Sequence, residues 1–165
     1  MNITISKTGR AARVALIDVA LVAVMCAVPA LSHVLAFPLY KLNPMLGVML
    51  AGMMLVKDRR NALLMAVVLP LVSMLVTGML AFPKMVCMAA ELLTVSAVFG
   101  VASGRMKCFP AVLLSIVAGR GVYYMAKALL ISPVALVGTE WWIQVVTSLA
   151  WAAVFAAWYK SQWGA

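Results

Sequence analysis

The chain has 165 residues, of which 67% are hydrophobic and 10% are charged, and its mean hydropathy is +1.12. Soluble domains carry about 25% charged residues, so this composition excludes a soluble protein and predicts an integral membrane protein. The formal net charge of +9 would favour a nucleic-acid partner in a soluble protein, but here it is typical of loops that follow the positive-inside rule. We therefore expect one integral membrane domain over residues 1–165, with the lipid bilayer and no nucleic acid as its partner.

Six apolar segments, separated by polar or basic turns, predict six transmembrane helices. The expected ranges are 11–36, 44–56, 61–78, 82–104, 109–131 and 141–159. Most of them match the ~20 residues that a helix needs to cross a bilayer. The predicted fold class is therefore an all-α membrane protein, a six-transmembrane-helix bundle.

The first segment follows a basic leader and carries small side chains at every fourth position. They form a ridge of Ala11, Ala15, Val19, Ala23 and Ala27. Small side chains let a second helix approach closely, so the ridge predicts an interface, either with a helix of this chain or with another protein. Asp18 is expected to pair with Arg10 or Arg13 or to reach the membrane interface, and Pro29 is expected to interrupt the helix.

The connection from Ser32 to Pro44 contains two prolines and an asparagine, which predict a loop. Its His33 is the one histidine of the chain, and without a neighbouring carboxylate or cysteine we do not expect it to bind a metal. Ser73 and Thr77 stand four residues apart in the third segment and share a helix face. Their hydroxyls either line a polar cavity or bond the carbonyls of their own helix.

A polar stripe runs along the fifth segment. Arg120, Tyr123, Tyr124 and Lys127 are spaced so that all four lie on one face of a helix. An arginine near the centre of a membrane helix costs about 2.5–3.5 kcal/mol on insertion scales. Glu91 lies at a similar depth on the preceding antiparallel segment, so we expect it to pair with Arg120. The pair either only offsets the insertion cost or also forms the floor of a binding site.

Basic residues are distributed unevenly between the two sides of the predicted bundle. With a cytoplasmic N-terminus, nine of the thirteen fall on the inner side, Lys41 and Lys84 fall outside, and Arg120 and Lys127 lie in the membrane. This asymmetry predicts that both termini are cytoplasmic, an N-in/C-in topology.

We expect a pocket that opens toward the outer face above the predicted Glu91–Arg120 pair. Its candidate substrate-binding residues are Tyr123, Tyr124, Lys127, Arg120, Glu91, Ser73, Thr77, His33, Tyr40, Asn43 and Trp141. Lys127 would hold the carboxylate or phosphate of a small planar or partly apolar ligand stacked on the tyrosines, unless its side chain instead extends to the lipid headgroups. Motifs of metalloproteases, serine hydrolases and P-loop NTPases are absent, so we expect no enzymatic activity, no cofactor and no metal.

In length, hydropathy and predicted topology the chain resembles the substrate-binding S components of energy-coupling factor (ECF) transporters. Ala11 to Ala15 is similar to the AxxxA motif by which these proteins dock onto a transmembrane coupling subunit, and Ala23 to Ala27 extends it. The loop from His33 to Asn43 occupies the position of the family's substrate-covering loop. The resemblance implies high-affinity uptake of a vitamin or related micronutrient at the bacterial plasma (inner) membrane, with a coupling subunit and cytoplasmic ATPases as partners. It does not identify the ligand.

Two other interpretations remain open. A structural, non-transporting protein similar to the cell-shape factor MreD would use the small-residue ridge for assembly and would need no polar pocket. A membrane sensor similar to the tetrapyrrole-binding translocator proteins is the other, although that family has five helices and a Trp-rich pattern that this chain lacks.

Overall fold

The computed structural model describes residues 7–37, 39–78, 81–131 and 141–163, with the backbone alone described at positions 7, 8, 40, 77, 141 and 160–163. This part of the chain is all helical. Its elements are α1 (Lys7–Val34), the short 3₁₀ helix η1 (Leu39–Leu42), α2 (Pro44–Val56), α3 (Arg59–Thr77), α4 (Phe82–Ala102), α5 (Cys108–Leu130) and α6 (Trp141–Trp163). The bounds of the α-helices lie within four residues of the predicted ranges. The all-α fold class is confirmed.

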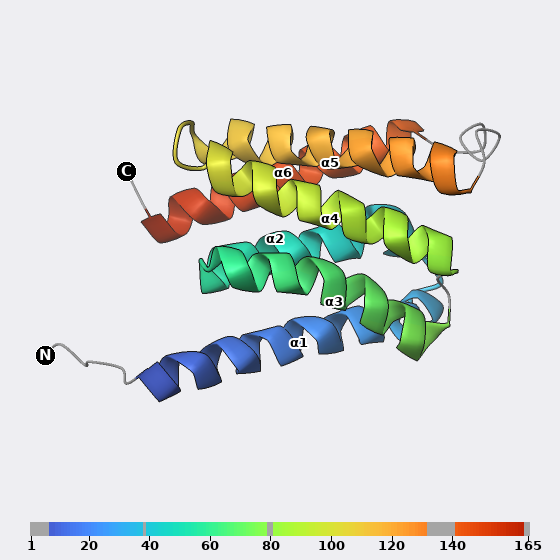
Figure 1. Ribbon diagram of the computed structural model, residues 1–165, viewed down its shortest axis with the longest axis horizontal. Helices are drawn as coiled ribbons and strands as arrows, with labels where there is room; N and C mark the ends of the chain where they lie inside the picture. Colours follow the sequence, from blue (N-terminus) through green and yellow to red (C-terminus); the bar gives the residue numbers. More distant parts are fainter. Residues whose placement is uncertain (1–6, 38, 79–80, 132–140, 164–165) are drawn as a thin grey trace, which may run out of the picture.

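The helices run back and forth between the two ends of the molecule, so that α1 begins at the same end at which α6 finishes (Figure 1). Five of the described helices, α1, α3, α4, α5 and α6, are long and apolar enough to cross a membrane. The sixth, α2, is a shorter apolar helix of 13 residues. These features identify a multi-pass membrane protein. A sixth span and the N-in/C-in orientation stay predictions.

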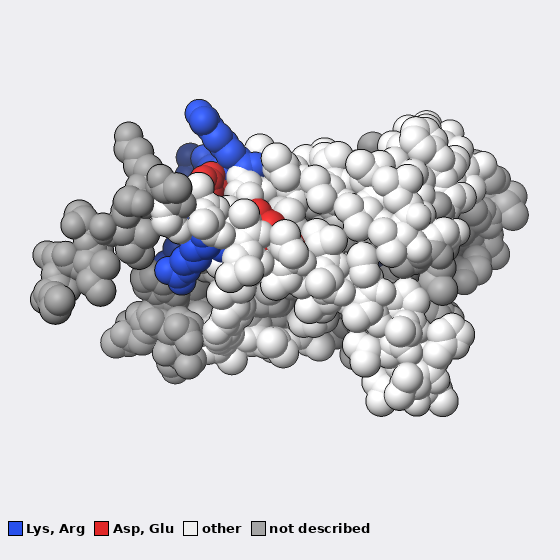
Figure 2. All heavy atoms as spheres, turned by 90° about the horizontal axis from the view of Figure 1, so that it is seen from below, with Lys and Arg blue, Asp and Glu red and all other residues white. Residues whose placement is uncertain are grey.

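The surface of the molecule is mostly apolar. Leu16, Leu75 and Leu129 are 71%, 71% and 83% exposed, and many other large apolar side chains are exposed as well. Contact between so much apolar surface and water would be unfavourable. On the face shown in Figure 2, the charged side chains gather toward the end where α1 begins, and the rest of the described surface is uncharged. A hydrocarbon environment around the bundle explains this surface, because lipid tails solvate apolar side chains.

The short helix α2 lies in the core. Seven of its residues are buried, among them Leu46, Met49 and Leu50, and it packs against α1, α3 and α6. The indole of Trp151 on α6 lies directly against Gly47, where an added Cβ would come within 2.4 Å of the ring. Its Nε1 donates a hydrogen bond to the Leu42 carbonyl at 2.8 Å. Gly47 and Trp151 therefore join α6 to the η1–α2 connection.

Helices α4 and α5 form the most extensive helix–helix contact of the bundle. On α5, Ala111, Ser115 and Gly119 are all buried and four residues apart, and Gly119 lies in the seam with α4. A Cβ at Gly119 would lie 2.5 Å from Cγ2 of Val95 and 3.0 Å from the backbone oxygen of Glu91. Small residues at every fourth position permit such a close approach between membrane helices, and this seam brings the faces that carry Glu91 and Arg120 together.

Helix α1 differs from our expectation in two respects. It continues through Pro29 to Val34 without interruption, as membrane helices that contain proline commonly do. Asp18, which we expected to pair with Arg10 or Arg13 or to reach the membrane interface, accepts a hydrogen bond from Asn61 Nδ2 at 2.9 Å. The partner of this carboxylate is therefore an amide on the adjacent helix α3.

The small-residue ridge of α1 is not covered by the described part of the chain. Its members Ala11, Ala15, Val19, Ala23 and Ala27 are all exposed. In the described structure α1 packs only against η1, α2 and α3, and it does so with other faces. An interface with a helix of this chain, one of the two alternatives, is therefore not observed.

Candidate functional site

Glu91 on α4 and Arg120 on α5 form an ion pair in the interior of the bundle. Arg120 Nη1 lies 3.2 Å from Glu91 Oε1, and the two side chains are 16% and 3% exposed. Either charge alone would be expensive at this depth, because there is no water to solvate it. The structure thus confirms the pair that the sequence predicts.

Asn43 brings a third polar group to this pair from the other half of the chain. It precedes α2 with φ 49° and ψ 60°, a left-handed conformation that asparagine tolerates better than most residues. Its carbonyl accepts hydrogen bonds from the N–H groups of Leu46 and Gly47 at 3.1 and 3.4 Å. This backbone geometry leaves the Asn43 side chain beside the Glu91 carboxyl.

Three atoms of this group have unmet hydrogen-bonding capacity. Asn43 Nδ2, Glu91 Oε1 and Arg120 Nε are buried and form no hydrogen bond of normal geometry with the described residues. The first and third are donors, and the second is an acceptor that the Arg120 cation faces without a well-aligned hydrogen bond. A buried donor without a hydrogen bond costs about 1–3 kcal/mol, so two such donors in or beside this ion pair are unusual for a purely structural core.

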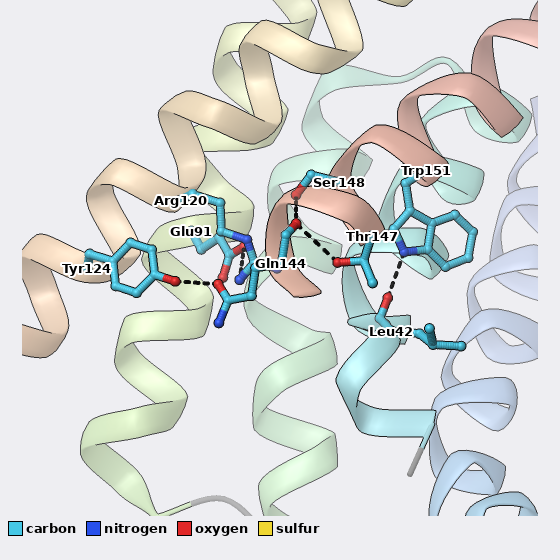
Figure 3. Close-up of polar contacts among 8 residues, drawn as sticks. All are labelled: Leu42, Glu91, Arg120, Tyr124, Gln144, Thr147, Ser148 and Trp151. Carbon is cyan, nitrogen blue, oxygen red and sulfur yellow. Dashed lines mark hydrogen bonds and ion pairs between the residues drawn. The ribbon is translucent and has the colours of Figure 1, made fainter. Parts of the chain in front are cut away.

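Tyr124 extends the polar group to α6. Its hydroxyl donates a hydrogen bond to Oε1 of Gln144, as Figure 3 shows. The backbone oxygen of Gln144 in turn accepts hydrogen bonds from Thr147 Oγ1 at 3.1 Å and Ser148 Oγ at 2.6 Å. We name Asn43, Glu91, Arg120, Tyr124 and Gln144 the central polar cluster. It joins four elements: the start of α2, α4, α5 and α6.

The remaining predicted residues on α5 continue along the same face. The rings of Tyr123 and Tyr124 meet edge to face, with centroids 5.6 Å apart and an interplanar angle of 73°. They therefore do not form a parallel slot, and a flat ligand can stack on one ring only. Lys127 is half-buried one turn farther along the helix, within electrostatic range of Cys87 on α4.

The other predicted site residues are more scattered. Ser73 is buried on α3. His33 is exposed in the last turn of α1, a helix that does not contact α4 or α5 within the described structure. Thr77 is the last residue of α3, Tyr40 lies in η1, and Trp141 is the first residue of α6. The side chains of these three residues are outside the described part of the structure. The structure thus brings together Asn43, Glu91, Arg120 and Tyr124 and keeps His33 apart.

Gln144 is the member of the cluster that sequence reasoning missed. Its signal was present, because Gln144, Thr147 and Ser148 stand at i, i+3 and i+4 in an otherwise apolar helix and share one face. An uncharged side chain has a smaller insertion cost than arginine, so the sequence does not require a polar partner for Gln144 as it does for Arg120.

No family model, no curated protein and no solved structure matches the chain. The resemblance to S components therefore depends on the residues of this chain alone.

Proposed function

We propose that the protein binds a small molecule within the membrane at the central polar cluster, as the substrate-binding component of an uptake transporter. One observation carries the proposal: within the described part of the chain, three buried N and O atoms that lack a hydrogen bond of normal geometry lie in or beside a single ion pair. Ionisable residues inside membrane-spanning helices are rare, and they commonly mark the pathway of a substrate or an ion. A ligand that supplies the missing partners would recover part of the cost of burying these groups.

The transporter class that we propose is the ECF type, with this chain as its S component in the bacterial inner membrane. Two features support this assignment. The exposed Ala11, Ala15, Ala23 and Ala27 leave room for a helix of a coupling subunit. The chain itself has no ATP-binding motif, so cytoplasmic ATPases would have to supply the energy.

The ligand that we propose is a small, planar or partly apolar vitamin-like molecule with a carboxylate or phosphate. Lys127 lies one turn beyond Tyr123 and Tyr124 on the same face of α5, where its ammonium group would contact the anionic group of the ligand. The edge-to-face tyrosines offer one aromatic face for stacking. Binding energy would therefore come from one charged contact, one stacking contact and the hydrogen bonds of the central polar cluster.

The test begins with the small molecules that co-purify with the full chain, identified by mass spectrometry after the protein is denatured. Equilibrium binding of the identified compound is then compared in the wild type, Lys127→Met and Lys84→Met. Lys84 is the matched control, because it is an exposed lysine in the first turn of α4. We expect Lys127→Met to weaken binding by about ten-fold or more, as loss of a charge-assisted hydrogen bond does, and Lys84→Met to leave it unchanged.

Unchanged affinity in Lys127→Met, or a cationic ligand, would contradict the anionic ligand. Recovery of no small molecule by a folded protein, together with no binding of vitamins and their phosphates in a screen, would contradict the binding function itself.

A further inference from the structure

A cleft of about 290 Å³ lies at the other end of α2 from Asn43. It is formed by the end of α2, the start of α3 and the ends of α4 and α6. Fourteen residues separate Asn43 from Lys57, which corresponds to about 20 Å along a helix. The cleft is therefore separate from the central polar cluster and is not explained by the proposed function.

Two cations and one carboxylate stand at this cleft. Lys57 and Asp58 form the tight turn between α2 and α3, Arg59 begins α3, and all three residues are exposed. The Asp58 carboxylate is engaged, because Oδ1 accepts a hydrogen bond from the Arg60 N–H at 2.9 Å and caps α3. The described residues that line the cleft therefore carry two formal positive charges, on Lys57 and Arg59, and one negative charge, on Asp58.

Arg59 is held in place across the cleft. Its Nη2 donates a hydrogen bond to the Gly100 carbonyl near the end of α4. A Cβ at position 100 would lie 2.8 Å from Arg59 Nε, so the guanidinium packs closely against Gly100. A guanidinium has five N–H donors, and one bond to a carbonyl leaves others for an anion.

The rest of the cleft is apolar or aromatic. Met53, Met54, Ala62 and Phe99 form its apolar part, and Tyr159 of α6 adds a half-exposed aromatic ring. A cationic rim beside an apolar floor fits a molecule that is itself anionic at one end and apolar at the other. A free phosphate ion would leave the apolar part in contact with water.

We propose that this cleft binds the headgroup of an anionic phospholipid, with its phosphate beside Lys57 and Arg59 and its glycerol and first methylenes against Met53, Met54 and Phe99. The cleft lies at the ends of membrane helices, where lipid headgroups are the most abundant amphiphiles. Basic pockets between transmembrane helices are known to bind anionic headgroups. The bound lipid joins α2, α3, α4 and α6 at this end of the bundle.

Native mass spectrometry of the full chain in detergent tests the proposal, with dioleoylphosphatidylglycerol or dioleoylphosphatidylcholine added. The wild type should retain the anionic lipid in preference to the zwitterionic one. The double variant Lys57→Gln/Arg59→Gln should bind phosphatidylglycerol about ten-fold more weakly or worse. The matched control is Arg105→Gln/Lys107→Gln, which removes two exposed charges in the α4–α5 turn that do not line the cleft.

Arg59 also donates a hydrogen bond to the Gly100 carbonyl, so its substitution can change the packing of α3 against α4. Two further variants leave this hydrogen bond in place. Lys57→Gln alone should weaken binding about five-fold. Ser103→Trp should also weaken it, because Ser103 is an exposed residue of the cleft and the indole would fill it without a change in charge. Both variants should keep wild-type helix content by circular dichroism.

Three results would overturn the proposal. The first is an equal loss of binding in the two double variants, which would indicate a diffuse basic surface. The second is full retention of phosphatidylglycerol by Ser103→Trp. The third is displacement of the lipid by glycerol phosphate at equal concentration, which would make the cleft a site for soluble anions. None of these results depends on whether the central polar cluster binds a ligand.

Discussion

At the scale of single residues, Glu91 is the side chain on which the interior depends most. It is 3% exposed inside a membrane-spanning helix, so the bundle itself must balance its charge. Arg120 supplies the opposite charge, and Asn43 lies beside the same carboxyl. A buried ion pair seldom adds net stability over apolar residues, but removal of one partner leaves an uncompensated charge. The two kinds of change can therefore be separated by experiment.

We expect Glu91→Gln to destabilise the protein by about 3–5 kcal/mol, because the Arg120 guanidinium is then buried without a counter-charge. The double variant Glu91→Gln/Arg120→Gln should lose clearly less than the sum of the two single changes. Unfolding of the detergent-solubilised protein by SDS, followed by circular dichroism, measures both. Additive losses would show that the two side chains do not interact energetically in the native state.

Part of the central polar cluster could be predicted at this scale. Helical rise and the positions of the turns place Glu91 and Arg120 at one depth, and the cost of burying either charge makes their pairing necessary. Asn43 and Gln144 could not be placed in the same way. Asn43 reaches Glu91 through a left-handed backbone turn, and Gln144 depends on how α6 is rotated against α5. Neither property is encoded in hydropathy.

At the scale of helices, hydropathy and turn residues were sufficient to locate every α-helix. The apolar runs end at Lys57–Asp58 and near Gly104, where charge or glycine interrupts them, and the helices end close by. Packing was harder to predict. Gly47 and Gly119 lie at close contacts between helices, but glycine is also common in membrane helices for other reasons. Spacing alone therefore did not identify the α2–α6 contact or the place of Gly119 in the α4–α5 contact.

The α4–α5 seam makes a sharp prediction at Gly119. We expect Gly119→Ala to destabilise the protein by about 1–3 kcal/mol, because the added methyl group would press against Val95 and the Glu91 backbone and force the helices apart. Gly121→Ala is the control, since a Cβ there meets nothing within 4 Å and alanine favours the helix. SDS unfolding of both variants measures the difference. Equal stability of the two would contradict the close approach.

The exposed ridge of α1 makes a second prediction at this scale. Ala15→Trp should abolish co-purification with a coupling subunit, because an indole blocks the close approach of a partner helix. Ligand binding by the isolated chain should not change, since α1 contacts neither α4 nor α5 in the described structure. Ala20→Trp serves as the control, because Ala20 is exposed on another part of α1. Loss of ligand binding in Ala15→Trp would indicate that the ridge supports the fold instead.

At the scale of the whole molecule, the ends of the bundle differ in charge. The turns after α2 and α4 and the start of α3 carry Lys57, Arg59, Arg60, Arg105 and Lys107. Helix α1 begins and α6 finishes at the same end (Figure 1). The opposite end has few basic residues, with Lys41 and Lys84 among them. Positive charge near the ends of membrane helices is retained on the cytoplasmic side during insertion, so the asymmetry predicts that this end of the bundle is cytoplasmic.

Cysteine labelling in intact cells tests this orientation. Lys84 and Arg105 are both exposed; Lys84 lies in the first turn of α4 and Arg105 lies three residues beyond its other end. A membrane-impermeant maleimide should label Lys84→Cys in intact cells and should label Arg105→Cys only after the membrane is permeabilised. The wild-type chain, with Cys26, Cys87 and Cys108, provides the background. The reverse pattern would place the basic end outside and the phospholipid cleft in the outer leaflet. It would also place the exposed Ala11 and Ala15 on the side of the membrane opposite to cytoplasmic ATPases. The reverse pattern would therefore contradict the proposed role as an S component as well as the orientation.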